Sequence, residues 1–506
     1  MNRGADRHST QIRPVEAVEI DPNLGEPPAS LTSAPAAATP YHSLPLATPK
    51  STRVLRILPP ELQDGDNITC QLEVISLNDE QRPAFCALSY VWGSPTETRC
   101  ITVNNELFVV RKNLWVFLDC MRKQGFQDLL WIDAVCINQD CIPERNHQVA
   151  VMGDIFRTAT RVLAWLGPES TIASPDWEGL TYSGGATPRT ESLLHIPIFD
   201  SIRLIMELSK PVRSGVCTSI WIDETFRITA LLLKHLKDIF NAEYWKRMWI
   251  VQEYILARDI SVMTDRSQMT GNEILTAWNT FCPEDDIYRY MNSFSGSSYS
   301  MKRLTDHSGP RRHRHLAKKK NLPVLEAAID DLREEASHAF RMVQFSEALE
   351  IMERREDLHS ASRIAPFEVL IEICQDMKCF DPRDHVYALL SLTKPDDLAF
   401  YELSPDYSKS ALLLYIQLGY GAQMRGDYKR SFLFGNVLGI DAPTVLQVFD
   451  KVRERALLDR SLGRQSSPEK VAEEIAPLII PLSSKVPFTS SGINLPQSLL
   501  LDNRFR

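Results

Sequence analysis

Short apolar runs that end at turn-forming residues are the main pattern in the first third of the chain. Residues 85–91 form one such run, which stops at a Trp-Gly-Ser-Pro turn, and residues 129–135 form another. Apolar runs of this length without polar alternation are typical of strands buried on both faces, which belong to parallel sheets covered by helices. The sequence therefore predicts two buried strands, and we expect them to be parallel neighbours.

Helical patterns separate and follow these strands. Residues 113–123 place apolar side chains at helical spacing between the two strands, so the order strand, helix, strand predicts a crossover unit. A further helix is predicted to begin near Pro143, because proline suits a first helical turn, where its missing N–H would have no partner. Residues 161–166 then predict a third buried strand.

Alternating patterns predict antiparallel structure around this unit. Residues 53–58 and 68–75 predict two strands that pair with each other, and residues 101–110 predict a β-hairpin. Its turn is Asn104-Asn105, since asparagine tolerates the positive φ that two-residue turns need. Residues 193–241 are helical in character, and amphipathic helical patterns recur from residue 326 onward.

Composition and charge narrow the class of protein. The formal net charge of -9 argues against a protein built around wrapping nucleic acid. A basic stretch between Lys302 and Lys320 is either a solvated loop between domains or a signal for nuclear import or nucleic-acid contact. The N-terminal segment holds no apolar run typical of a signal sequence, and no run of about eighteen apolar residues follows. We expect a soluble intracellular protein, cytoplasmic unless the basic stretch directs it to the nucleus.

Cysteines and cofactor motifs give no sign of a metal or a resident cofactor. The 10 cysteines are scattered without a Cys-x-x-Cys motif. The Cys136/Cys141 and Cys374/Cys379 pairs lack histidines at zinc spacing, so we expect reduced thiols and no metal site. Motifs of dinucleotide redox enzymes, nucleoside triphosphatases and serine hydrolases are also missing, so we expect no bound cofactor.

Polar side chains gather where the two predicted strands end. Ligands of open α/β sheets bind outside the carboxyl ends of the strands, and this edge would present an aromatic face, amides and carboxylates, which suit a nucleotide-like ligand. Asp133 belongs either to this site or to a structural ion pair with Arg145 or Arg161. The predicted ligand-binding residues are Ser89, Tyr90, Trp92, Gly93, Asp133, Asn138, Gln139, Arg145 and Gln148.

Six segments together resemble the heterokaryon incompatibility (HET) domain of filamentous fungi. Four of them follow in the family's order within residues 87–167, and two lie further along the chain. The segments are ALSYVWG (87–93), LWIDAVCINQ (130–139), ERNHQV (144–149), AWLG (164–167), WKRMWIVQE (245–253) and DPRDHVYALL (381–390).

The resemblance implies an architecture. We expect a three-layer α/β domain with a mainly parallel sheet, similar to a Toll/interleukin-1 receptor (TIR) domain, over residues 53–255, with an insertion near residues 170–190. Residues 1–50, rich in Pro, Ala, Ser and Thr, predict a disordered leader, because they cannot bury enough apolar surface to offset their ordering entropy. Residues 256–325 predict a linker with the basic loop, and residues 326–506 a mostly α-helical C-terminal region.

The resemblance also implies a function. HET domains act in fungal non-self recognition and trigger regulated cell death, and some TIR domains cleave NAD with one glutamate and no metal. NAD is then a substrate, and Glu144 is the residue to which we assign the catalytic carboxylate. Glu144 alternatively stabilises its helix, because an acidic side chain is favourable in a first helical turn. The competing function is a non-catalytic interaction module, and in both cases we expect self-association and a second incompatibility protein as partners.

Overall fold

The computed structural model describes residues 40–59, 67–173, 196–213, 221–281, 338–339, 342–343, 346–360 and 364–479. The basic stretch between Lys302 and Lys320, most of the predicted insertion and residues 1–39 of the predicted leader lie outside the described residues. Ordered structure already begins before residue 50, since Tyr41 and Leu44 pack against the hydrophobic core.

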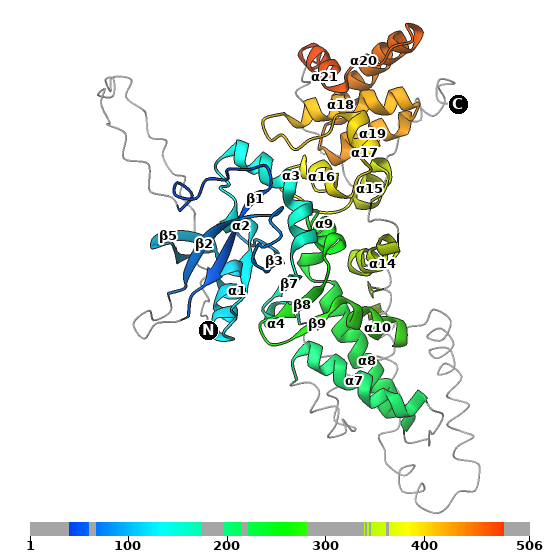
Figure 1. Cartoon of the computed structure of the whole chain (residues 1–506). Coiled ribbons are helices and arrows are strands. Elements are labelled where there is room, and N and C mark those ends of the chain that lie inside the picture. The colour runs from blue at the N-terminus through cyan, green and yellow to red at the C-terminus, as the bar shows by residue number, and fades with distance from the viewer. Residues whose placement is uncertain are drawn as a thin grey trace, which may run out of the picture. The chain divides into compact units, whose positions relative to one another are not determined.

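A mixed sheet forms the centre of the N-terminal half (Figure 1). The described residues form nine strands in the order β5-β4-β2-β1-β6-β3-β7-β8-β9. The strands are β1 (Ser51–Ile57), β2 (Thr69–Ser76), β3 (Phe85–Tyr90), β4 (Thr98–Val103), β5 (Glu106–Arg111), β6 (Leu129–Trp131), β7 (Arg161–Gly167), β8 (Ile260–Thr264) and β9 (Gln268–Thr270).

The central strands of this sheet are parallel, as predicted. β3 pairs in parallel with β6 on one side and with β7 on the other, and β8 continues the parallel set beyond β7. Antiparallel pairs flank it, because β1 runs against β6 and β9 runs against β8. The predicted pairing of the first two strands is confirmed, since β1 and β2 are antiparallel along their length.

The β4–β5 hairpin is also confirmed. Its turn residues Asn104 and Asn105 have φ values of 50° and 68°, the left-handed conformation that a two-residue hairpin turn requires.

The second buried strand is shorter than predicted. β6 ends at Trp131, and Asp133 opens a short helix, α2 (Asp133–Cys136), instead of extending the strand. The helical turn closes through a hydrogen bond from the Cys136 N–H to the Ile132 carbonyl at 2.7 Å. The apolar run alone predicts that the strand continues to residue 135. It ends earlier because Asp133, a polar residue with hydrogen-bond partners inside the protein, begins the helix.

Helices cover both faces of the sheet. Trp165 of β7 donates a hydrogen bond to Asn113 in α1 (Lys112–Lys123). Ala164, the residue before Trp165 in β7, pairs with Ser89 of β3. The Ser89 side chain bonds to Glu253 in α9 (Ile250–Leu256). Because neighbouring residues of a strand point to opposite faces, α1 and α9 lie on opposite sides. α3 (Ile142–Thr158) shares the α9 side, and the domain has three layers.

The sheet continues beyond residue 255, the end of the domain predicted from the sequence, because β8 and β9 belong to it. The remaining elements of this half are helical: α4 (Glu169–Ile172), α7 (Ile198–Arg213), α8 (Trp221–Phe240), η1 (Glu243–Lys246) and α10 (Gly271–Phe281).

The C-terminal region is helical in its described part, as predicted. The described residues of this region form no strand of the sheet, and none of the described helices has the length and apolar character needed to cross a membrane. The helices are α14 (Glu347–Ser360), α15 (Phe367–Cys374), α16 (Asp384–Tyr387), η3 (Leu390–Leu392), α17 (Pro395–Tyr401), α18 (Ala411–Arg425), α19 (Tyr428–Val437), α20 (Ala442–Ser461), α21 (Pro468–Ile475) and η4 (Ala476–Leu478).

Helix α3 contacts the C-terminal region near both of its ends. Arg157 donates to the Ser391 carbonyl at 2.6 Å, and Asn146 accepts the Tyr407 backbone N–H at 2.9 Å. Between these two contacts Gly153 lies so close to Ser391 that an added Cβ would overlap its side chain. The absence of a side chain at residue 153 therefore allows the two parts to approach.

We expect Gly153→Val to lower the free energy of unfolding by about 1–3 kcal/mol, the usual cost of overpacking a tight contact. Urea denaturation followed by tryptophan fluorescence would measure it. Ala150→Val, at an exposed position of the same helix, should change stability by less than about 0.5 kcal/mol. Adding Ser391→Gly to Gly153→Val should recover part of the loss; equal losses in the single and double variants would contradict the packing argument.

Candidate functional site

The carboxyl ends of the parallel strands carry the polar residues predicted from the sequence. β3 ends at Tyr90, followed by Trp92 and Gly93, and β6 leads into Asp133. Since β1 runs antiparallel to β6, its first residues lie at the same edge. This edge is therefore where groups from β1, β3, α2 and the start of α3 come together.

A buried hydrogen-bonded cluster joins the end of β3 to α9 and η1. The Ser89 hydroxyl bonds to the Tyr244 hydroxyl at 2.8 Å and donates to the Glu253 carboxylate. Arg247 donates to the Tyr90 carbonyl. Glu253 is only 3% exposed and Ser89 only 1%, so this carboxylate is separated from solvent within the single chain.

Burial raises the pKa of Glu253 to about 7. The Arg247 charge and the Ser89 hydrogen bond act in the opposite direction, and the Asp133 carboxylate adds to the rise. Burial also raises the pKa of Asp133, against the effects of Arg247 and of a hydrogen bond from Trp92. Arg247 thus favours the ionised form of both carboxylates, and Arg111 adds to this effect at Asp133.

Trp92 lies just after the end of β3 and binds the Asp133 carboxylate beside this cluster. Its indole N–H donates to the Asp133 carboxylate at 2.8 Å, and the Arg111 guanidinium lies 5.0 Å from the centre of its ring. Gly93 follows with a φ of 80° and accepts a hydrogen bond from Arg111 at 2.7 Å. The half-buried indole is thus held between the Asp133 carboxylate and the Arg111 guanidinium.

Glu144 lies at the same edge but forms a different set of contacts. Its carboxylate accepts two hydrogen bonds from Arg53 of β1, at 2.6 and 3.1 Å, and one from the Asn138 backbone N–H at 2.7 Å. The Arg53 side chain is 1% exposed and that of Glu144 16%, and the guanidinium also lies 4.8 Å from the ring centre of Tyr41. Glu144 is thus the counter-ion of a buried arginine.

The other predicted residues lie on both sides of this ion pair. Gln139 donates to the Asp133 carbonyl at 2.9 Å, so it supports the α2 turn. Gln148 is buried and bonds to Thr52 and to the Ser51 carbonyl, while Arg145 stacks over Tyr407 of the C-terminal region at 4.1 Å. The structure therefore brings Ser89, Tyr90, Trp92 and Asp133 into one cluster and directs Arg145 and Gln148 elsewhere.

Three residues of the cluster were not assigned to the site from the sequence: Tyr244, Arg247 and Glu253. The segment that supplies the last two, WKRMWIVQE, is one of those that resemble the HET family. A signal was therefore present, but no spacing rule connects this segment to a strand more than 150 residues earlier.

The chemistry of the cluster is that of carboxylates and hydroxyls. Among the described residues no group of three or more His, Cys, Asp or Glu side chains could hold a metal ion. A carboxylate with a pKa near 7 can stabilise a positive charge when ionised or accept a proton from water. Reactions that develop positive charge on carbon are therefore compatible with this site.

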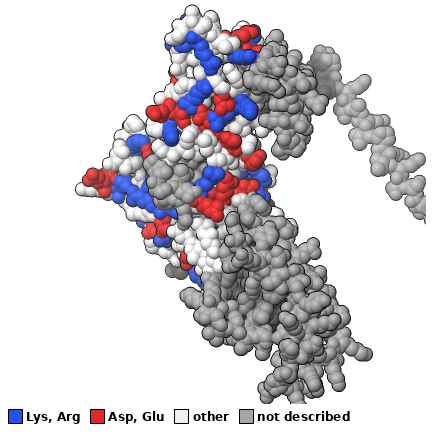
Figure 2. Space-filling model, turned by 90° about the vertical axis from the view of Figure 1, so that its right-hand side faces the viewer, with Lys and Arg blue, Asp and Glu red and all other residues white. Residues whose placement is uncertain are grey.

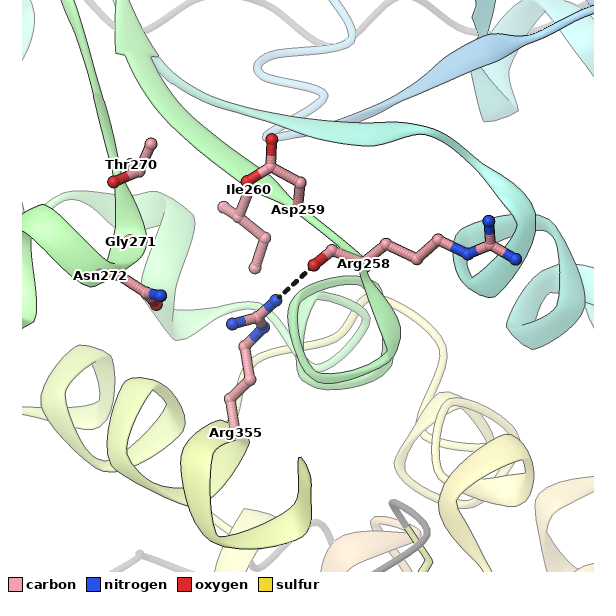
Figure 3. Close-up of a pocket in the computed structure, with 7 residues that line it drawn as sticks. All are labelled: Arg258, Asp259, Ile260, Thr270, Gly271, Asn272 and Arg355. Carbon is pink, nitrogen blue, oxygen red and sulfur yellow. Dashed lines mark hydrogen bonds between the residues drawn. The ribbon is translucent and has the colours of Figure 1, made fainter. Parts of the chain in front are cut away.

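A separate pocket lies at the amino ends of the parallel strands, where β8 begins (Figure 3). It has a volume of about 440 Å³ and is lined by residues from the β8 start, the α10 start and α14. The Arg355 guanidinium donates to the Ala257 and Arg258 carbonyls, both at 3.1 Å. Arg355 thus ties α14 to the loop before β8.

Acidic and basic side chains lie next to one another over the described part of the face in Figure 2. Neither sign of charge covers that part of the surface.

Comparisons with known proteins match part of the chain to a known family. Residues 85–253 match the family model described as Heterokaryon incompatibility protein (HET). The chain is 30% identical over 241 residues to "Heterokaryon incompatibility protein 6, OR allele" of Neurospora crassa, an alignment that covers 43% of this chain and 34% of that protein. The chain thus spans about a third of the length of this relative. No solved structure matches the chain.

Both Glu144 and Glu253 fall inside the matched segment. The family match and the similar incompatibility protein agree with the segments that resemble this family in the sequence. Residues 85–253 of the chain are therefore similar to the heterokaryon incompatibility domain.

Proposed function

We propose that this protein acts in fungal heterokaryon incompatibility and promotes regulated cell death by cleaving NAD when its copies assemble. The HET domain and the similarity to a protein named for heterokaryon incompatibility support the biological role. The observation that carries the chemical part is Glu253, a carboxylate buried at the carboxyl edge of the sheet whose pKa is raised to about 7.

The reaction needs one carboxylate and one water. The bond between the nicotinamide nitrogen and the ribose C1′ breaks, and its electron pair leaves with nicotinamide. The sugar then carries positive charge at C1′, which an ionised carboxylate stabilises. A water oxygen bonds to C1′ and releases one proton, so that the products are nicotinamide, ADP-ribose and a proton.

Glu253 fits this role better than Glu144. The Glu144 carboxylate already receives three hydrogen bonds, two of them from the buried Arg53. Removing Glu144 from that ion pair would leave the guanidinium uncompensated, which costs several kcal/mol. Glu253 has Ser89 as its hydrogen-bond donor, so its second oxygen can face a substrate once the site opens.

Assembly enters the proposal because the site is closed in the single chain. Ser89, Tyr90, Tyr244 and Glu253 are each at most 3% exposed, so NAD reaches them only after the surrounding side chains move. We propose that association between copies of the protein causes this opening.

The second candidate function is a non-catalytic interaction module. The observation that favours it is the same closure, since Glu253, Asp133 and Glu144 all have hydrogen-bond partners within the chain. In that case the buried cluster stabilises the fold, and the surface of the domain acts by binding other proteins.

Nicotinamide release from NAD by the full-length protein tests the catalytic proposal. We expect release to rise with protein concentration and to fall by at least about a hundredfold in Glu253→Gln, as for loss of a group that stabilises transition-state charge. Glutamine keeps the shape of the side chain and can still accept the Ser89 hydrogen bond, so circular dichroism should show an intact fold.

Glu144→Gln is the matched control. We expect it to lower the free energy of unfolding by about 3 kcal/mol, because a buried guanidinium loses its counter-ion, while the folded fraction still releases nicotinamide. No release from wild-type protein that is folded and associated would favour the interaction module. Loss of release in Glu144→Gln, but not in Glu253→Gln, would return the catalytic role to Glu144.

The raised pKa of Glu253 also predicts how stability depends on pH. The folded-state pKa of about 7 lies above the ordinary glutamate value of 4.5, so between these values the native state binds more protons than the unfolded state. The free energy of unfolding should therefore fall as the pH rises from 5 to 8. The expected decrease in the free energy of unfolding is about 3 kcal/mol, because each unit of pKa difference corresponds to about 1.4 kcal/mol.

Denaturant titrations of the wild type and Glu253→Gln across this pH range measure the effect, because the variant has no carboxyl group to titrate. We expect the stability difference between the two proteins to change by that amount in favour of the variant at high pH. A difference that stays constant from pH 5 to 8 would show that Glu253 is already ionised at pH 5.

A further inference from the structure

The edge strand β5 exposes two aliphatic side chains. Leu107 is 78% exposed and Val109 62%, the largest exposed fractions among the aliphatic residues of the described strands. β5 is the terminal strand in the order of the sheet, and the described part of the chain places no strand on its outer side (Figure 1). An exposed apolar edge strand is a template for pairing with another chain.

The backbone of β5 directs its free hydrogen-bonding groups outward at the same two residues. Val103 and Glu106 flank the two-residue turn and are paired in the β4–β5 ladder. Because the bonds of an antiparallel ladder alternate along the strand, Glu106, Phe108 and Val110 bond inward to β4. The N–H and C=O groups of Leu107 and Val109 consequently point away from the sheet.

These positions define a self-complementary register. When two copies of β5 pair around a two-fold axis perpendicular to the sheet, corresponding side chains of both copies lie on the same face of the joined sheet. The residues that bond across the contact are then those whose backbone N–H and C=O groups point away from β4. Centring the axis on Phe108 places Leu107 of each copy opposite Val109 of the other. The two Phe108 rings then form an aromatic cross-strand pair, a favourable combination in antiparallel sheets.

The charges at the ends of β5 are compatible with this register. Glu106 lies opposite Val110 of the second copy, and Arg111 lies opposite Asn105 of the second copy. No two like charges face each other, and the apolar centre of the strand is flanked by one acidic and one basic residue. The strand thus fits a second copy of itself without an unfavourable charged pair.

We propose that β5 is the assembly surface of this protein, where it pairs antiparallel with β5 of a second copy and joins two sheets into one. The proposal rests on the self-association included in the proposed function and names the surface that produces it. Arg111 is the last residue of β5 and also lies over Trp92, which binds Asp133, so a partner at this edge acts close to the Asp133 carboxylate.

Sedimentation velocity of the full-length protein over a range of concentrations tests the surface. We expect a concentration-dependent dimer in the wild type and a dissociation constant raised about tenfold or more in Leu107→Lys, since a lysine on an edge strand opposes pairing. Leu457→Lys adds the same charge at a 52% exposed leucine of α20 and should dimerise like the wild type.

The double variant L107K/V109E tests the register. Centring on Phe108 brings a lysine opposite a glutamate at two positions, so the double variant should recover dimerisation and lose it again at high salt. A wild-type protein that remains monomeric at all concentrations would overturn the proposal, and so would a Leu107→Lys variant that dimerises like the wild type. A double variant that fails to dimerise while Leu107→Lys is monomeric would reject the register around Phe108.

The outcome is separate from that of the catalytic proposal. Glu253→Gln should dimerise normally while nicotinamide release falls by at least about a hundredfold, whereas Leu107→Lys should retain its buried cluster. Dimerisation through β5 without NAD cleavage would leave the assembly surface in place and remove the enzyme activity.

Discussion

The hydrogen bond between Ser89 and Glu253 connects residues 164 positions apart in the sequence, and the rest of the domain depends on it. A carboxylate placed under a sheet must find donors inside the protein, because an unpaired buried charge is costly. The end of β3 provides the Ser89 hydroxyl, and Arg247 provides a nearby positive charge. These requirements hold α9, η1 and the central strand in one arrangement.

The two glutamates at this edge illustrate how position decides the chemistry of a side chain. Glu144 meets a guanidinium in a two-point contact that fixes both groups. Glu253 meets a neutral hydroxyl and has a cation only in its neighbourhood. Because a hydroxyl stabilises negative charge less than a bidentate arginine does, burial dominates at Glu253 and its pKa rises.

Local patterns predicted the strands of this protein better than its site. β3, β7 and the β4–β5 hairpin follow from runs of apolar residues and from two asparagines that adopt positive φ. The end of β6 did not, since an Asp133 bonded to Trp92 ends the strand through a contact that no local pattern contains. Glu253 could not be placed in the cluster for a similar reason: its neighbours are set by the packing of α9 on β3.

The position of β8 determines how much of the chain forms one folding unit. Residues 85–253 match the family, yet the next strand pairs in parallel with β7 along Val162–Trp165. A chain that ended at residue 255 would make β7 an edge strand and leave unpaired the backbone groups that now bond to β8. Recombination between related genes could therefore exchange this domain as a working unit only if the segment through β9 moved with it.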